Sequence, residues 1–473
     1  MSRAIGPDLY ADLVEVASRE GFGEWLSMVR ATGGCANPIH LWGESRMLDV
    51  STGEVLRQRD EGRLLVACGN RRASRCRTCS ETYRADTYQL IRAGLVGGKN
   101  VPDSVRSHAR VFATFTAPSF GPVHHLLETE AGRYGRCHPH GTVQCRVRHT
   151  PDDLLLGQPL DPTTYDYPNA VIWNALVTRL WPRTVQLANR QSARSLGISQ
   201  RDWPHVGRVS VAKVAEFQAR GLVHFHAIFR LDGPQPGDDP PAGATSDILT
   251  DAVEAAAKSA QVVPPLPIFL PVVWGEQLDL RTVDGDVMTD TQVAGYIAKY
   301  ATKGAGTAGT FDHPLACREC AGLGRLLGTD ATRCRPCHGT GLTYDLDSLQ
   351  VTPHARAMID MCWFLGGQTA LEDLRLRPWA HMLGFRGHFS TKSRRYSTTL
   401  GALRTARRQW RTKEMLRAHG IRADDAENVI IEGHWMYAGR GYSEGEAVYA
   451  ATIASDLVES RTIARQVEED VER

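Results

Sequence analysis

The chain has 473 residues, of which 42% are hydrophobic and 7% aromatic, and a formal net charge of +2. This composition excludes a disordered protein, a collagen and a simple coiled coil, and the length predicts two or three domains. The near-zero charge by itself gives no indication of a nucleic-acid partner. The N-terminus lacks a signal-peptide core, and the most apolar run, Val262–Trp274, is short and broken by prolines. We therefore expect a cytoplasmic protein without a membrane partner.

Periodicity and turn residues predict a mixed α+β chain. The expected elements, in chain order, are helical segments at 9–29 and 80–93, a strand at 110–116, a helix at 170–195, two strands around a tight turn at 208–231, a helix at 247–259, a strand near 277–283 and a helix at 291–303. A compact cysteine insertion follows at 317–341. The segment 353–420 is expected to be mostly helical and is very basic.

A pair of histidines, His224 and His226, is the sharpest chemical feature. Residues two apart on a strand point to the same face. If residues 219–221 form a three-residue hairpin loop with Gly221 left-handed, Glu216 lies opposite His224. One carboxylate and two imidazoles would then share a face, which suits Mg²⁺, Mn²⁺ or Zn²⁺. A His-x-His pair without such a glutamate is usually incidental.

Downstream, helical spacing places Tyr296, Lys299, Tyr300 and Lys303 along one side of a helix. Alone, this pattern is typical of an amphipathic helix with solvated lysines. A tyrosine has an ordinary pKa of about 10, and neighbouring ammonium groups favour its phenolate. Beside a metal site, a tyrosine nucleophile is what transesterification of a phosphodiester requires.

The order of these motifs resembles that of a known superfamily. The strand Phe112–Ser119 is similar to its first motif, the His pair to its second, and Tyr-x-x-Lys-Tyr at 296–300 to its third. The superfamily is that of the HUH endonucleases, which comprises rolling-circle replication initiators, relaxases and related transposases. Two further stretches, Gly33–Leu41 and Trp379–Gly401, resemble replication initiators of actinobacterial plasmids and integrative conjugative elements.

The resemblance implies a central antiparallel sheet flanked by helices, with the His pair on a central strand and Mg²⁺ or Mn²⁺ held by that pair and Glu216. It also implies nicking of one DNA strand at an origin, with the 5′ phosphate left on tyrosine and a free 3′ hydroxyl that primes synthesis. Tyr296 is then the first-choice nucleophile. Tyr300 is a possible second nucleophile, and Lys299 a stabiliser of phosphate or phenolate.

Eleven cysteines without a secretory signal indicate metal ligands rather than disulfides. The pairs Cys317-x-x-Cys320 and Cys334-x-x-Cys337 predict a four-thiolate structural zinc site. Each half continues with a similar glycine-containing sequence, and the doublet resembles the knuckles of DnaJ-type cysteine-rich modules.

A second zinc site is expected in the N-terminal segment. Cys68, Cys76 and Cys79 require a fourth ligand, for which Cys35 is the natural choice. A third group could form a further site, although the balance is slightly against zinc there. It comprises Cys137, His138, His140, Cys145 and His149. Cys362 is expected to be a buried thiol.

Between Arg375 and Arg417 lie twelve Lys or Arg, interrupted by a single acid, Glu414. Such a one-sided run favours phosphate contacts, and the interleaved aromatic residues favour base stacking. The aromatic residues are Trp379, Phe385, Phe389, Tyr396 and Trp410. The candidate DNA-binding residues are Arg386, Lys392, Arg394, Arg395, Arg404, Arg407, Arg408 and Arg411.

The expected organisation has five parts. They are an N-terminal helical and zinc-binding segment (1–100), an HUH nicking domain (105–310), a four-Cys zinc insertion (311–350), a basic helical DNA-binding region (351–425) and a C-terminal tail (426–473). The leading hypothesis is a metal-dependent DNA nicking and joining enzyme that starts rolling-circle replication. Its partners would be double- and single-stranded origin DNA and the host helicase and polymerase. The alternatives are a relaxase or transposase with the same chemistry, and a non-catalytic zinc-containing DNA-binding regulator.

Overall fold

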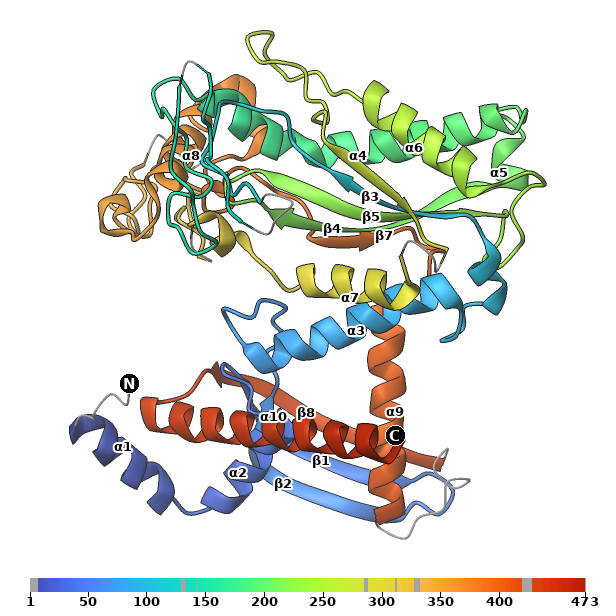
Figure 1. The fold of residues 1–473 in the computed structure, drawn as a ribbon. Helices are drawn as coiled ribbons and strands as arrows, with labels where there is room; N and C mark the ends of the chain where they lie inside the picture. Colours follow the sequence, from blue (N-terminus) through green and yellow to red (C-terminus); the bar gives the residue numbers. More distant parts are fainter. Residues whose placement is uncertain are drawn as a thin grey trace. The chain divides into compact units, whose positions relative to one another are not determined.

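The structure is a computed structural model that describes residues 7–128, 133–141, 143–284, 288–310, 313–326, 332–418 and 428–472. The chain divides into two compact units, which Figure 1 shows as ribbons. The central unit is Thr87–Thr398, and the end-joined unit combines Met1–Asp86 with Thr399–Arg473. The expected segments 1–100 and 351–425 are each divided between the two units.

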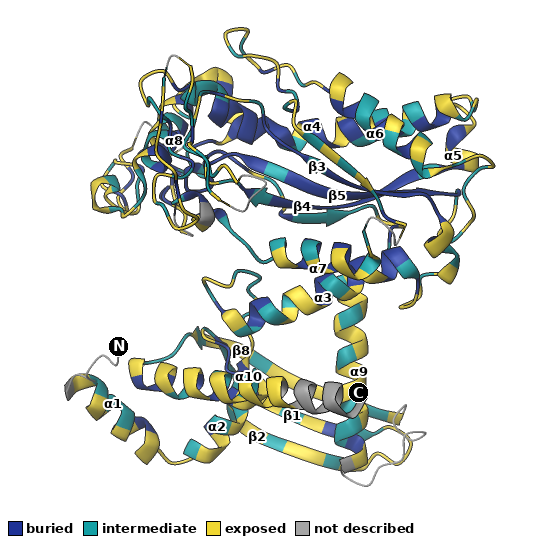
Figure 2. Cartoon of the chain, in the orientation of Figure 1, coloured by how far each residue is buried: buried dark blue, intermediate teal, exposed yellow. Residues whose placement is uncertain are grey.

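The central unit is built on a five-stranded antiparallel sheet in which β5 is the middle strand. Its strands, in spatial order, are β6 (Leu278–Thr282), β3 (Arg110–Phe115), β5 (Val223–Asp232), β4 (Arg208–Phe217) and β7 (Ser390–Lys392). Both β3 and β5 are almost entirely buried, as Figure 2 shows. A strand buried on both faces requires cover on both sides, and helices supply it.

Helices lie on both faces of this sheet (Figure 1). The helices of the central unit are α4 (Tyr167–Ser195), α5 (Trp203–Val206), α6 (Ser246–Ser259), α7 (Asp290–Tyr300) and α8 (Pro353–Leu365). On the α4 side, Trp181 packs edge-on against Phe115 and Phe225, with ring centroids 5.8 and 5.7 Å apart. Because side chains alternate along a strand, the neighbours of Phe225 point to the opposite face, toward α7. The hydrophobic core thus fixes β5 and leaves its histidines on the other face.

The end-joined unit contains a three-stranded antiparallel sheet in the order β2-β1-β8. Its strands are β1 (Ile39–Asp49), β2 (Val55–Val66) and β8 (Val429–Arg440), and its helices are α1 (Pro7–Ser18), α2 (Phe22–Ala31), α9 (Leu400–Ala418) and α10 (Glu444–Glu472). Helix α3 (Arg77–Val96) begins in this unit. Trp25 and Val29 of α2 share a small core with Ala450 and Ile453 of α10.

Three sequence expectations need correction. The N-terminal segment, expected to be helical and zinc-binding, also contains a β-hairpin at 39–66, whose residues are mostly intermediate or exposed and so carry no clear hydrophobic alternation. The expected tail at 426–473 instead contains β8, which pairs with β1, and α10, which packs on α1 and α2. The segment 353–420 was expected to be mostly helical, but in its described part, 353–418, only α8 and α9 are α-helices. None of the helices in the described ranges is long and apolar enough to cross a membrane.

Candidate functional site

The hairpin between β4 and β5 has the predicted register. Glu216 pairs directly with His224, and the backbone N–H of Gln218 donates to the carbonyl of Leu222 at 2.9 Å. Gly221 has a φ of 73°, the left-handed conformation that the tight turn requires. The turn therefore fixes which residues of the two strands stand side by side.

Three donor atoms converge on the face of the sheet that points toward α7. The Oε2 of Glu216 lies 3.0 Å from the Nε2 of His224 and 3.4 Å from the Nε2 of His226. The side chains are 12%, 15% and 3% exposed, respectively, so the group is mostly withdrawn from water. All three atoms lie within 4.8 Å of one another, which allows them to hold one metal ion. A carboxylate and two imidazoles leave coordination positions open for substrate oxygens.

The surroundings set the charge of this group. Burial alone would raise the pKa of Glu216, but its hydrogen bonds with His224, His226 and Lys303 lower it to about 2. Burial also lowers the pKa of His226, which favours the neutral, metal-binding imidazole. The Nδ1 of His226 lies 3.0 Å from the Oγ1 of Thr114, so this ring presents its Nε2 to the site.

Thr114 lies within the strand that resembles the first motif, but no sequence signal gave this residue a role of its own. Thr114 on β3 pairs directly with His226 on β5. Because β3 and β5 are separated by more than a hundred residues, only a correct pairing of the two strands could have identified this contact.

Helix α7 brings a tyrosine to the same place. Its start is fixed by a capping box, in which Thr289 is the N-cap and its Oγ1 accepts from the backbone N–H of Gln292. The Oη of Tyr296 lies 3.4 Å from the Nε2 of His226. The Tyr300 ring lies 4.6 Å from the Tyr296 ring and 5.1 Å from the His226 ring. Burial, and next the hydrogen bond with Tyr300, raise the pKa of Tyr296 well above its ordinary value.

The two lysines at the end of this helix differ in position. The ammonium of Lys303 donates to the Oε1 of Glu216 at 2.6 Å. Lys299 is exposed, and its ammonium lies 5.6 Å from the centroid of the Tyr300 ring. The lysine in contact with the candidate metal-binding group is therefore Lys303, whereas the family resemblance had assigned a role to Lys299.

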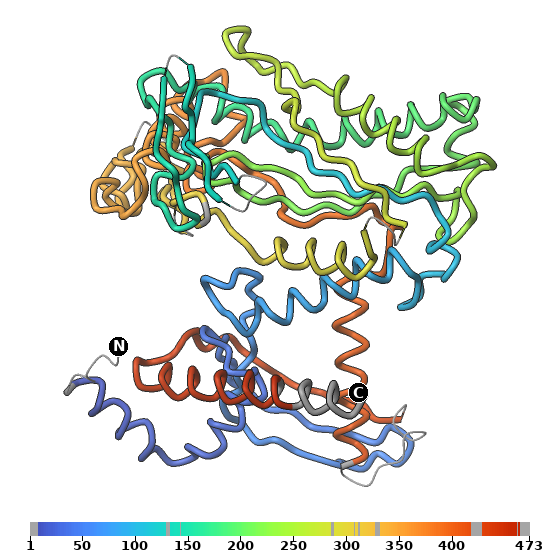
Figure 3. The backbone as a smooth tube through the Cα atoms, viewed as in Figure 1, coloured from blue at the N-terminus to red at the C-terminus, as the bar shows by residue number. Residues whose placement is uncertain are grey.

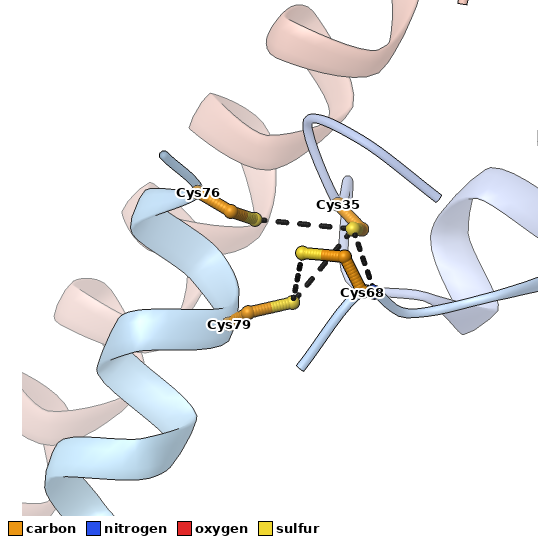
Figure 4. Close-up of side chains that lie close together, drawn as sticks. All are labelled: Cys35, Cys68, Cys76 and Cys79. Carbon is orange, nitrogen blue, oxygen red and sulfur yellow. Dashed lines mark hydrogen bonds between the residues drawn. The ribbon is translucent and has the colours of Figure 1, made fainter. Parts of the chain in front are cut away.

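The N-terminal cysteine set lies within the end-joined unit. Cys35 follows α2, Cys68 follows β2, and Cys76 and Cys79 lie at the start of α3 (Figure 4). The Sγ of Cys35 is 3.8 Å from that of Cys76 and 3.7 Å from that of Cys79, and Cys68 and Cys79 are 3.6 Å apart. Four sulfurs around zinc, each at a bond length of about 2.3 Å, lie about 3.8 Å apart. The spacing is that of a zinc tetrahedron and far longer than a disulfide bond.

The second four-cysteine set lies in the central unit and has the same dimensions. The Sγ atoms of Cys317 and Cys334 are 3.8 Å apart, and those of Cys320 and Cys337 are 3.7 Å apart. The glycines that follow each pair donate backbone N–H groups to sulfur at 3.3 Å. Both sets could hold a metal ion, and all eight cysteines are free thiols. Cys362 is fully buried, as expected.

The candidate ligands at 137–149 also lie close together, but they form two groups that differ from the expected one. Cys137, Cys145 and His149 lie within ligand distance of His124, which the sequence analysis did not single out. His138 belongs instead to a three-residue group with His125 and Cys137. Within the described residues, His140 belongs to neither group.

The basic segment is divided between the two units and is less available than its sequence suggests. Phe385, Phe389 and Tyr396 are buried in the central unit, so the expectation that they stack on bases is wrong. They were misassigned because aromatic residues between basic ones can equally be core residues. Trp410 on α9 is 62% exposed and remains accessible.

Four of the candidate DNA-binding residues bond within the protein. Two of them, Arg386 and Arg395, each donate one hydrogen bond to a backbone carbonyl, of Asp373 and Pro234 respectively, and stay exposed. The other two are less accessible. The ammonium of Lys392 donates to three backbone carbonyls, and burial lowers its pKa. Arg407 pairs with the carboxylate of Asp86 inside the end-joined unit. Six of the candidate arginines are exposed, namely Arg386, Arg394, Arg395, Arg404, Arg408 and Arg411.

Comparison with known proteins identifies the family of the chain. The family model described as "Replication initiator protein, pSAM2" matches residues 21–455 of the chain. A protein of Streptomyces ambofaciens named "Replication initiator protein" is 44% identical over 483 residues, which cover 98% of this chain and 97% of the relative. No solved structure matches the chain. The chain belongs to the replication initiator protein family represented by that of pSAM2.

Proposed function

We propose that this replication initiator nicks one strand of origin DNA with Tyr296 as the nucleophile and thereby starts rolling-circle replication. The observation that carries the proposal is the 3.4 Å distance between the Oη of Tyr296 and the Nε2 of His226, beside Glu216 and His224. A phenol placed at a candidate metal group is suited to attack a phosphodiester. Mg²⁺ or Mn²⁺ held by these three residues would polarise the scissile phosphate.

The proposed step is a transesterification. The Oη of Tyr296 forms a bond to phosphorus while the bond from phosphorus to the 3′ oxygen breaks. The phenol loses its proton and the departing 3′ oxygen gains one, so no oxidant or reductant is involved. The 5′ end remains on the tyrosine, and the 3′ hydroxyl primes synthesis. Tyr300, whose ring is 4.6 Å from that of Tyr296, is the candidate for a second transfer.

The remaining groups support this function in the proposal. The two four-cysteine sets hold structural zinc, because their sulfur spacing fits a zinc tetrahedron. The six exposed arginines of the basic segment contact DNA phosphates, and Lys299 contributes positive charge beside Tyr300. The central unit performs the nicking, and the host supplies helicase and polymerase.

The test uses the full chain and single-stranded oligonucleotides from the DNA that flanks its own gene. With Mn²⁺ we expect a covalent protein–DNA adduct on a denaturing gel, and with EDTA none. Tyr296→Phe should abolish the adduct, whereas the matched variant Tyr300→Phe should still form it. If no strand gives a metal-dependent adduct, the enzyme proposal is wrong and a non-catalytic DNA-binding role replaces it. If only Tyr300→Phe loses the adduct, Tyr300 is the nucleophile.

A further inference from the structure

The chain makes a long excursion between β3 and α4, at residues 116–166, which Figure 3 shows as a teal to green tube. In its described part, 116–128, 133–141 and 143–166, this excursion contains no helix and only isolated β-bridges. Ordered segments of this length without regular structure need another source of rigidity. One of the bridges joins His138 to Cys145 and brings two cysteines of the excursion together.

Four side chains of the excursion converge with the dimensions of a zinc site. Ligand atoms of His124, Cys137, Cys145 and His149 all lie within 4.8 Å of one another. The Nε2 of His149 is 3.1 Å from the Nδ1 of His124 and 3.5 Å from the Sγ of Cys145. Zinc bonds of about 2.0 Å to nitrogen and 2.3 Å to sulfur place neighbouring tetrahedral ligands about 3.3 to 3.8 Å apart. The observed distances lie close to this range.

Two contacts outside the ligand set favour a metal. The Nδ1 of His149 lies 2.6 Å from the Oδ2 of Asp153, and the His149 side chain is fully buried. A carboxylate on the far nitrogen of a histidine is the usual orienting partner in zinc sites and directs Nε2 to the ion. The backbone N–H of His125 donates to the Sγ of Cys137 at 3.3 Å, as glycine N–H groups do in the set at 317–337.

We propose that His124, Cys137, Cys145 and His149 bind a structural zinc ion. The competing group of His125, Cys137 and His138 shares one cysteine with it and offers only three ligands. A closed four-ligand set is the arrangement that structural zinc prefers. This inference does not depend on the proposed nicking activity.

The ion would position the hairpin that carries the candidate active site. His124 exchanges backbone hydrogen bonds of 2.8 Å with Gly157 and Gln158. Gly157 in turn touches the hairpin loop, since a Cβ at this position would lie 2.3 Å from the carbonyl carbon of Ala219. The loop beginning at Ala219 sets the register of Glu216 with His224. Through Gly157 and Ala219, the proposed zinc site is thus connected to the strands that carry Glu216, His224 and His226.

The test is the zinc content of the purified full chain, measured by mass spectrometry after dialysis into zinc-free buffer that contains Mg²⁺. Three zinc-binding sets predict three zinc ions per chain. His124→Ala and Cys145→Ser should each hold two zinc ions per chain, whereas the matched controls His138→Ala and His140→Ala should each hold three zinc ions. The zinc content of a Glu216→Gln variant shows whether the group of Glu216, His224 and His226 also holds zinc.

A second variant keeps the test valid if the ligand variants do not fold. Asp153→Asn retains all four ligands and should bind three zinc ions, but one of them should be about 10–100-fold more weakly held against a chelator. The proposal is overturned if the wild type holds only two ions, if His124→Ala holds as many as the wild type, or if His138→Ala loses one instead. An unchanged chelator competition for Asp153→Asn would also contradict it.

Discussion

At the scale of single residues, the orientation of His226 decides what the candidate site can do. Its Nδ1 contacts Thr114 and its Nε2 faces both Glu216 and Tyr296. A histidine whose Nδ1–H donates to an oxygen is restricted to the tautomer that binds metal through Nε2. Thr114 is therefore a positioning residue for the candidate metal site.

Replacing Thr114 by valine removes this hydrogen bond but preserves the shape of the side chain. We expect the affinity for Mn²⁺ to fall by about 10–100-fold, because a metal ligand loses its orienting partner. Mn²⁺ binding is measured by electron paramagnetic resonance or calorimetry. The matched control is Thr116→Val, which also removes a buried hydrogen bond, here to the carbonyl of Gln277. Equal effects of the two variants would show that Thr114 acts only through stability.

The charge of Glu216 predicts a pH dependence. Its pKa of about 2 in the folded protein is below the unfolded value of about 4.3. A carboxyl group of this kind stabilises the folded state above pH 4 or so, and the contribution is lost as the pH falls toward 2. In buffer free of Mg²⁺ and Mn²⁺, Glu216→Gln should lower the free energy of unfolding at pH 6 by up to about 3 kcal/mol.

The difference in the free energy of unfolding between the wild type and Glu216→Gln should become smaller when the pH is lowered from 6 to 3. Thermal unfolding at each pH measures it. The control is Glu254→Gln, which removes an exposed pair with Lys258 on α6 and should have little effect at either pH. A difference for Glu216→Gln that widens on acidification would contradict the assignment.

At the scale of elements, local signals predicted what lies close in sequence. The β4–β5 turn followed from Gly221 and the hydrophobic pattern, and the helix expected at 291–303 corresponds to α7. The meeting of Tyr296 with His226 came only from the family resemblance, because 70 residues separate the two side chains. The pairing of β1 with β8 was missed altogether, since their exposed faces give no periodic signal.

Helix α10 provides a direct test of the end-joined unit. Ile453 is 6% exposed and packs in the core with Trp25, whereas Ile463 on the same helix is 53% exposed. We expect Ile453→Ala to lower the free energy of unfolding of this unit by about 2–5 kcal/mol, and Ile463→Ala by less than about 0.5 kcal/mol. Amide hydrogen exchange of β1 reports the unit during urea unfolding. Equal effects would mean that α10 does not pack on this core.

At the scale of the whole molecule, the charge near zero conceals an uneven distribution. The basic segment is one run in sequence, but residues up to 398 belong to the central unit and the α9 residues to the end-joined unit. On α9, Arg404, Arg408 and Arg411 are exposed along with Trp410. DNA contacts are therefore expected from both units.

Replacing the three exposed α9 arginines by glutamine should weaken binding to origin DNA and reduce its salt dependence. Each lost phosphate contact reduces the magnitude of the slope of log K against log salt by about 0.9 on duplex DNA. The slope of the triple variant should therefore be smaller in magnitude by about 2–3. The matched control replaces Arg183, Arg190 and Arg194, three exposed arginines of α4. Fluorescence anisotropy at several salt concentrations measures the slopes. The same loss for both triple variants would show that only net charge matters.

The construction of the end-joined unit also imposes an order of events during synthesis. The strand β1 is made early, but its partner β8 is the last strand of the chain. At about 5–20 residues per second, the ribosome needs roughly 15–60 s to make the residues 87–398 that separate the two halves of the unit. During this time the central unit can fold, while β1 has an unpaired edge. A chain that ends after residue 398 but before β8 would therefore contain the central unit and an N-terminal segment in which β1 has an unpaired edge, and such a partly folded segment is a substrate for cellular proteases.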